Sequence, residues 1–261
     1  MVQLYNMNTK NLIVANWKMN PVSQKEAKNI FDAIRDGSKG LKAEVVICPP
    51  SVYLYASVFG EGVVSMGAQN IYFEDKGAFT GEISALMVKD LGVEYVIIGH
   101  SERRKYFGET NEIVNQKIKK ALEAGLKIIF CIGETTEERA NGKKNEVLEG
   151  QVKQGLNGIS AQGGPASGWE NINIAYEPVW AIGTGNNCSV EETRQSIVFI
   201  KDCLARQNAV AFVGQVRVLY GGSVKSENSG SYIKDAGANG LLVGGSSLNA
   251  EEFIKIVKSA E

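Results

Sequence analysis

Short apolar runs alternate with amphipathic segments along the chain. Eight runs are almost continuously hydrophobic and rich in β-branched residues, which is typical of parallel strands covered on both faces. They are NLIVAN (11–16), EVVICP (44–49), VVSMG (63–67), YVIIG (95–99), KIIFCIG (127–133), INIAY (172–176), VRVLYG (216–221) and GLLVGG (240–245). Strands that alternate with helices predict an α/β protein with a parallel sheet.

The segments between the runs place apolar residues at helical spacing. Examples are Ala27, Ile30, Phe31 and Ile34, then Ile197, Ile200 and Leu204, and finally Phe253, Ile254 and Val257. Three pairs have the spacing of a capping box, which predicts helix starts: Ser23 with Glu26, Thr135 with Glu138, and Ser189 with Glu192.

Eight such units in 261 residues favour a closed (β/α)8 barrel, formed by a single domain over residues 11–261. Residues 1–10 are then an N-terminal extension. A doubly wound open sheet is the alternative, but it usually has fewer strands, and no G-x-G-x-x-G follows the first run. The Gly-, Pro- and Ser-rich segment 162–168 only separates a helix from the sixth strand.

Composition narrows the possible partners. The net charge of −1 argues against nucleic-acid binding, which needs a clear basic excess. No apolar run approaches the roughly 18 residues of a membrane span, and the first ten residues lack the features of a secretory signal. The chain is therefore expected in the cytoplasm. Its four scattered cysteines, without a C-x-x-C pair, predict reduced thiols and no metal site or disulfide framework.

In barrels of this kind the reactive groups lie at the carboxyl ends of the strands and in the loops that follow. The candidates are Asn16 and Lys18 after the first run, His100, Ser101 and Glu102 after the fourth, Glu177 after the sixth, and the glycine pairs 221–222 and 244–245 after the last two. His100 is the only histidine. At a strand end it could be a structural residue or the centre of the chemistry.

The two glycine pairs indicate an anion site. Small residues let backbone N–H groups approach an anion, and the last two loops of such barrels commonly hold phosphate. Ser223 adds a hydroxyl, and Gly183 adds a further flexible amide. We therefore expect a phosphorylated substrate.

Glu177 ends an apolar strand and is followed by Pro178 and the apolar segment 179–185. An apolar segment with a proline at one end and glycines at the other is typical of a lid with restricted hinges. A lid that closes over Glu177 would exclude water and suit the carboxylate to general-base work. Two roles are open for Lys18: a fixed positive charge beside substrate oxygens, or a Schiff-base nucleophile.

Several motifs, taken together, resemble the triosephosphate isomerase family. They are ANWKMN (15–20), GAFTGE (77–82), GHSERR (99–104), CIGET (131–135), YEPVWAIGTG (176–185), YGGSV (220–224) and the final GG. They follow in order over nearly the whole chain. The resemblance implies isomerisation of a triose phosphate without a cofactor or metal. A Schiff-base aldolase acting through Lys18 and a catalytically inactive binding protein are the alternatives.

The resemblance also implies residue roles. Glu177 moves the proton between the two substrate carbons, and His100, as neutral imidazole beside a helix start, polarises the carbonyl. Lys18, paired with Glu102, stabilises the negative intermediate, and Asn16 orients substrate oxygens. The phosphate would be held by Gly183, Ser223, Gly244 and Gly245.

Supporting roles transfer in the same way. Ser101 holds the glutamate while the lid is open, Glu134 bonds Trp180, and Tyr220 is a partner of the closed lid. The lid is built by Pro178, Val179, Trp180, Thr184 and Gly185. The stretch 69–82, with Phe79 and Thr80, corresponds to a loop that enters a neighbouring subunit, which implies a homodimer. Departures from the family pattern are Asn186, Asn187 and Cys188 after the lid, and Ser246 after the last glycine pair.

Overall fold

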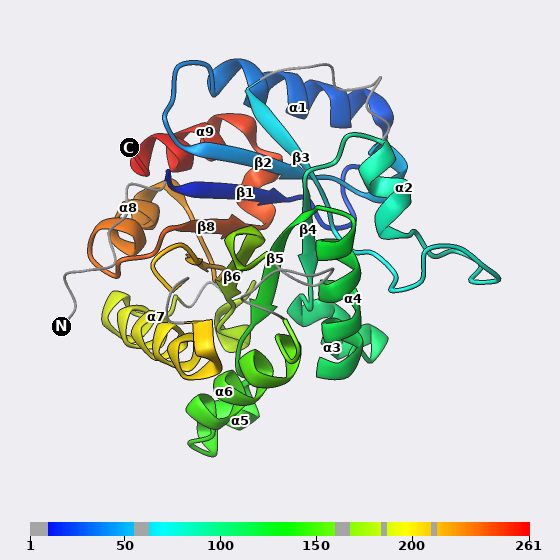
Figure 1. Ribbon diagram of the computed structural model, residues 1–261. Coiled ribbons are helices and arrows are strands. Elements are labelled where there is room, and N and C mark those ends of the chain that lie inside the picture. The colour runs from blue at the N-terminus through cyan, green and yellow to red at the C-terminus, as the bar shows by residue number, and fades with distance from the viewer. Residues whose placement is uncertain (1–9, 55–62, 160–167, 184–186, 210–212) are drawn as a thin grey trace.

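The computed structural model describes residues 10–54, 63–159, 168–183, 187–209 and 213–261. Eight parallel strands form a closed barrel in the order β1 to β8, and β8 pairs with β1 (Figure 1). The strands are β1 Leu12–Asn16, β2 Glu44–Cys48, β3 Val64–Ala68, β4 Tyr95–Ile98, β5 Lys127–Ile132, β6 Ile172–Tyr176, β7 Arg217–Tyr220 and β8 Gly240–Val243. The predicted single-domain (β/α)8 or TIM barrel is confirmed, and each strand lies within its apolar run except β3, which extends one residue past it to Ala68.

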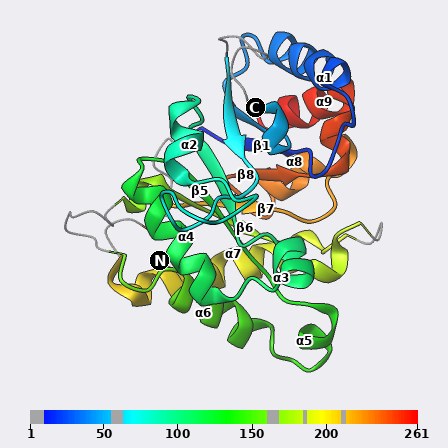
Figure 2. The same cartoon turned by 90° about the vertical axis from the view of Figure 1, so that its right-hand side faces the viewer.

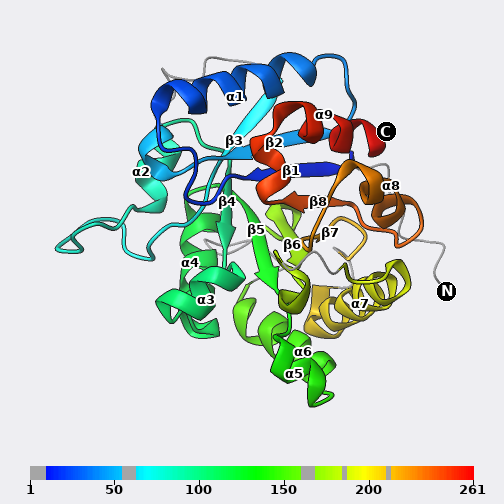
Figure 3. The same cartoon turned by 180° about the vertical axis from the view of Figure 1, so that it is seen from behind.

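Helices cover the outside of the barrel, as Figures 1 and 2 show. They are α1 Gln24–Gly37, α2 Ala85–Asp90, α3 Ser101–Phe107, α4 Asn111–Glu123, α5 Thr136–Ala140, α6 Lys144–Gly155, α7 Val190–Leu204, α8 Ser226–Lys234 and α9 Ala250–Ser259. Short helical turns are η1 Ser51–Tyr53, η3 Trp169–Asn171, η4 Val179–Ala181, η5 Ala205–Ala209 and η6 Gly245–Leu248. The first helix, α1, packs beside the last, α9, and so completes the ring (Figure 3).

The core has two layers because side chains alternate along each strand. In β1, Leu12 and Val14 belong to a cluster built from strand residues alone, which fills the barrel interior. The neighbouring Ile13 and Ala15 pack in a larger cluster with helix residues such as Phe31 of α1. Most strands are therefore apolar on both faces, which explains why the runs are nearly continuous in the sequence.

All three predicted capping serines and threonines begin helices, but only one forms the full capping box. Thr135 and Glu138 make both reciprocal hydrogen bonds. Ser23 and Ser189 accept the expected backbone N–H groups, without the return bond from the glutamate side chain. The carboxylate of Glu192 instead accepts hydrogen bonds from Arg139 and Lys144. Residues distant in sequence can therefore bind the glutamate side chain, which then does not bond back to the N-cap backbone.

Several predictions fall on residues outside the described ranges. These are most of the N-terminal extension, the linker segment 162–168 apart from Gly168, and the lid residues Thr184 and Gly185. In the part of the chain that is described, no helix is long and apolar enough to cross a membrane.

A polar network closes the amino-terminal end of the barrel, opposite the strand ends that carry the candidate residues. Arg217 donates to Glu44 at 2.6 Å and to Asn173 at 2.7 Å, and the Tyr95 hydroxyl also donates to Glu44. Burial works against the ionisation of Glu44, but the hydrogen bonds from Tyr95 and Arg217 outweigh it and lower the pKa of this carboxyl. Burial raises the pKa of Tyr95 to about 12, so its hydroxyl stays a donor.

Replacing Glu44 should weaken this end of the barrel in a pH-dependent way. Glu44→Gln removes a charged acceptor from Arg217, and we expect a loss of about 1–2 kcal/mol in the free energy of unfolding at pH 7. Because the folded-state pKa is lowered, the stabilisation is complete above the unfolded value near 4.5 and is lost as the pH falls through the folded value. Urea unfolding at pH 7 and below pH 4.5 measures the difference. Glu146→Gln on the exposed face of α6 is the matched control, and an equal loss there would contradict the account.

Candidate active site

The carboxyl ends of the strands enclose a cavity of about 210 Å³. Its lining contains most of the residues that the sequence singles out, contributed by strands far apart in the chain. They are Asn16, Lys18, His100, Glu177, Gly183, Gly221, Gly222, Ser223, Gly244, Gly245 and Ser246. Barrel closure therefore brings together groups that are up to 230 residues apart in sequence.

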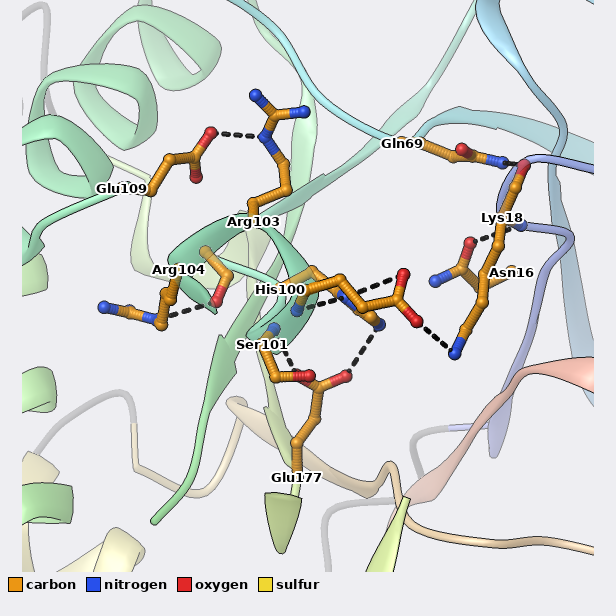
Figure 4. A network of polar contacts seen from close by, with 11 residues as sticks. Asn16, Lys18, Gln69, His100, Ser101, Arg103, Arg104, Glu109 and Glu177 are labelled. Carbon is orange, nitrogen blue, oxygen red and sulfur yellow. Dashed lines mark hydrogen bonds and ion pairs between the residues drawn. The ribbon is translucent and has the colours of Figure 1, made fainter. Parts of the chain in front are cut away.

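Glu177 follows β6 and is buried, with only 2% of its surface exposed. Its Oε2 accepts a hydrogen bond from the backbone N–H of Ser101 at 3.0 Å, and its Oε1 lies 3.1 Å from His100 Nε2 (Figure 4). Gly221 of the next strand end makes room for it, because a Cβ there would lie 3.0 Å from Glu177 Cγ. Both carboxylate oxygens thus have partners on the loop after β4.

His100 is the N-cap of α3. Its Nδ1 accepts a hydrogen bond from the backbone N–H of Glu102 at 3.2 Å. A ring nitrogen that accepts carries no proton, so the neutral ring carries its proton on Nε2, the atom that faces Glu177. The local backbone therefore selects one neutral tautomer that can donate into the cavity.

Lys18 is held by its surroundings in an uncommon backbone conformation. Its φ is 54°, and it is the one non-glycine residue with a positive φ in the described ranges. Asn16 Oδ1 accepts from its backbone N–H at 3.0 Å, and Gln69 donates to its carbonyl at 2.8 Å. Its Nζ forms an ion pair with Glu102 at 2.6 Å (Figure 4). These contacts place one positive charge at the mouth of the cavity.

The first turn of the predicted lid contacts Glu134, a fully buried residue in the loop after β5. Trp180 Nε1 donates to Glu134 Oε1 at 2.8 Å, and the Tyr176 hydroxyl donates to the same carboxylate at 3.2 Å. Burial raises the pKa of the Tyr176 phenol, which therefore remains a donor. The backbone N–H of Val179 also donates to the Glu134 carbonyl at 3.1 Å. Pro178 precedes this turn and is buried.

The glycine-rich strand ends form one wall of the cavity. Gly245 begins η6 directly after β8, an arrangement that many barrels use for phosphate. Ser246 lies in the same lining, and its hydroxyl donates to the Val224 carbonyl at 2.7 Å, so it joins the loops after β7 and β8. At Gly222 a Cβ would lie 2.2 Å from the Tyr220 hydroxyl, so this position has no room for a side chain.

Several predicted residues do not line this cavity, among them Tyr220, Phe79 and Thr80. Tyr220 is buried, and its ring stacks on Tyr232 of α8 with centroids 3.9 Å apart. Tyr232 in turn donates to the carbonyl of Cys188, just after the lid. Phe79 and Thr80 lie in the exposed segment between β3 and α2, which projects from the barrel (Figure 1).

The structure adds residues that the sequence reasoning did not single out. Gln69 follows β3 and donates to the carbonyls of both Lys18 and Cys48 at 2.8 Å. The strand-end rule could have found it. Arg104 donates to the Gly99 carbonyl at 2.8 Å, and Gln151 of α6 bonds the backbone of Gly133. Arg104 and Gly99 belong to the same segment after β4, whereas the partner of Gln151 lies in another loop and no local pattern marks that glutamine.

Comparison with known proteins identifies relatives over nearly the full length. The family model described as triosephosphate isomerase matches residues 11–260. The triosephosphate isomerase of Alkaliphilus oremlandii is 45% identical over 251 residues, covering 95% of this chain and 98% of the relative. Those of Carboxydothermus hydrogenoformans and Dictyoglomus thermophilum are 44% and 43% identical, each covering 96% of this chain and 99% of the relative.

Proposed function

The chain belongs to the triosephosphate isomerase family of glycolytic enzymes, and from this premise we propose that Glu177, His100 and Lys18 interconvert dihydroxyacetone phosphate and D-glyceraldehyde 3-phosphate through an enediol(ate). The observation that carries the proposal is their meeting in one cavity from three different strand ends. A carboxylate, a neutral imidazole and an ammonium group supply the base, the electrophile and the charge that this isomerisation needs.

Glu177 is the general base in this proposal. It removes a proton from C1 of dihydroxyacetone phosphate and returns it at C2. In the structure its carboxylate is bonded to Ser101 and faces His100, so it must turn toward the substrate before it reacts. This arrangement supports a resting state in which the loop after β4 holds the base while the lid is open.

His100 acts as a neutral hydrogen-bond donor. Its Nε2–H polarises the substrate carbonyl, and the ring then carries protons between the two oxygens of the enediol(ate). The hydrogen bond from Glu102 to Nδ1 supports this role, because it leaves the single proton on the nitrogen that faces the cavity.

Lys18 stabilises the negative intermediate by its charge, with Asn16 orienting substrate oxygens. Its Nζ is engaged in an ion pair with Glu102 at 2.6 Å. A Schiff base requires a free amine as nucleophile, so the ion pair supports the electrostatic role over an aldolase mechanism.

The phosphate group binds Gly183, Ser223, Gly244 and Gly245, which line the same cavity as the three reacting groups. The lid begins with the turn 179–181, where Trp180 donates a hydrogen bond to Glu134. Its remaining residues include Thr184 and Gly185. Closure excludes water, which protects the intermediate from losing its phosphate. Tyr220 contributes from below the lid.

We also propose that the enzyme works as a homodimer in the cytoplasm. Beside Lys18 lies a second cavity of about 340 Å³, lined by Met19, Gln69 and Phe107 among others. Met19 and Phe107 are largely exposed, as is Phe79 on the projecting segment. Insertion of this segment, with Thr80, into the cavity of a partner copy would cover these apolar side chains. The four cysteines are buried free thiols, which suits a reducing compartment.

The activity can be tested with purified protein and glyceraldehyde 3-phosphate, with the product coupled to an NADH-consuming reductase. We expect turnover by the wild type. In Glu177→Asp the carboxylate retreats by one methylene group, so kcat should fall by about two orders of magnitude or more while KM changes little. No turnover by a well-folded wild type would overturn the proposed reaction. A near-normal kcat for Glu177→Asp would overturn only the role of Glu177.

The dimer can be tested by placing a charge on the projecting segment. Phe79→Asp should yield a species with half the wild-type mass by light scattering and a strongly reduced kcat, since the proposed interface reaches Lys18 and Asn16. Val198→Asp places the same charge on an exposed apolar position of α7, on another face, and should leave mass and activity unchanged. A wild-type protein of monomer mass, or an unchanged mass for Phe79→Asp, would contradict the proposed interface.

A further inference from the structure

Gln151 of α6 makes two hydrogen bonds to a single backbone residue at the end of β5. The backbone N–H of Gly133 donates to Gln151 Oε1 at 2.8 Å, and Gln151 Nε2 donates to the Gly133 carbonyl at 3.2 Å. A side-chain amide offers one acceptor and two donors, so it can satisfy both groups of a peptide at once. Gln151 lies in the outer helical ring and outside the lining of the substrate cavity.

Gly133 needs this partner because the sheet ends just before it. The last registered pair between β5 and β6 is Ile132 with Tyr176. The backbone N–H of Glu177 still donates to the Ile132 carbonyl at 2.7 Å, and that of Val179 donates to the Glu134 carbonyl at 3.1 Å. Between these two bonds, the side-chain amide of Gln151 pairs with the N–H and the carbonyl of Gly133, in place of a neighbouring strand.

Gly133 also lies directly against the backbone of the proposed base. A Cβ at Gly133 would lie 1.7 Å from the carbonyl oxygen of Glu177 and 3.2 Å from its Cα. Only glycine allows this approach, so a displacement of Gly133 is transmitted to Glu177. The next residue, Glu134, holds Trp180 at the start of the lid. Two consecutive residues of the loop after β5 therefore contact the backbone of the proposed base and the start of the proposed lid: Gly133 lies against Glu177, and Glu134 bonds Trp180.

Packing alone does not hold this loop in place. A cavity of about 270 Å³ borders it on the side of α5 and α6, and its lining includes Gly133, Gln151, Glu177 and Val179. Where atoms on one side are missing, close contacts cannot define a position. On this side, the two hydrogen bonds with Gln151 restrain Gly133.

We propose that Gln151 is a positioning residue for the isomerisation, which holds Glu177 and the start of the lid in register through Gly133. The inference rests on the proposed role of Glu177 as the base. It assigns Gln151 no contact with substrate. Its removal should therefore affect the chemical step and leave substrate binding, which depends on the loops after β7 and β8, nearly unchanged.

Gln151→Met removes both hydrogen bonds and keeps the length of the side chain. We expect kcat to fall by about 10-fold to 100-fold, because a small displacement of a base is costly to proton transfer, and KM to change by less than about threefold. Gln154→Met is the matched control. Gln154 is an exposed glutamine of the same helix and accepts a hydrogen bond from Asn111 instead. It should keep the wild-type kcat.

Gln151→Glu provides a readout that a purely structural role would not change. At neutral pH its carboxylate can accept from the Gly133 N–H but repels the Gly133 carbonyl, and on protonation it regains a donor for that carbonyl. The ratio of its kcat to that of the wild type should therefore rise as the pH is lowered from 8 to 5.5. A flat ratio would overturn the proposal, as would a wild-type kcat for Gln151→Met.

These outcomes are separate from a failure of the proposed function. If the wild type does not turn over the substrate, the reaction assignment is wrong. If the wild type is active and both Gln151 variants match it, only the role of Gln151 is wrong. Gln151→Met could fold poorly, which a lowered melting temperature would show. In that case the ratio of the kcat of Gln151→Glu to that of the wild type, measured across pH, still decides the question.

Discussion

Closure of the parallel barrel is the constraint on which the rest of the structure depends. Because β8 pairs with β1 and every strand runs the same way, all eight carboxyl ends open on one face. Loops that are distant in sequence then share one cavity, and Lys18 lies within 4 Å of the position a side chain on Gly244 would take. The opposite end is sealed by the Glu44–Arg217–Tyr95 network. Stability and chemistry are thus assigned to opposite ends of the barrel.

The site is held together mainly by backbone groups. Ser101 and Glu102 use their amides at the start of α3 to bind the Glu177 carboxylate and the His100 ring. The same helix start thereby holds the proposed base, Glu177, in its resting position and selects the tautomer of the proposed electrophile, His100. On the other side, the loop after β5 supports Glu177, because Gly133 packs against the backbone of Glu177. Backbone groups cannot change rotamer, so such a site is preorganised at little entropic cost.

Much of this could be predicted from the sequence, for identifiable physical reasons. Strands covered on both faces are largely apolar, so all eight could be recognised as nearly continuous runs. The strand-end rule then pointed to Asn16, Lys18, His100 and Glu177 without any long-range information. The contacts of Gln151 could not be predicted, because its partner is a backbone group in another loop. The missing half of the capping box at Ser189 has the same cause, since Arg139 and Lys144 bind Glu192 from other elements.

The central claim is that the start of α3 selects the tautomer of His100 that has its proton on Nε2, because the Glu102 amide occupies Nδ1. Nitrogen NMR on protein labelled with 15N-histidine tests this directly, since the chain has a single histidine and hence one pair of ring signals. At neutral pH we predict an unprotonated Nδ1 and a protonated Nε2. A ring protonated on both nitrogens, or on Nδ1 alone, would contradict the account.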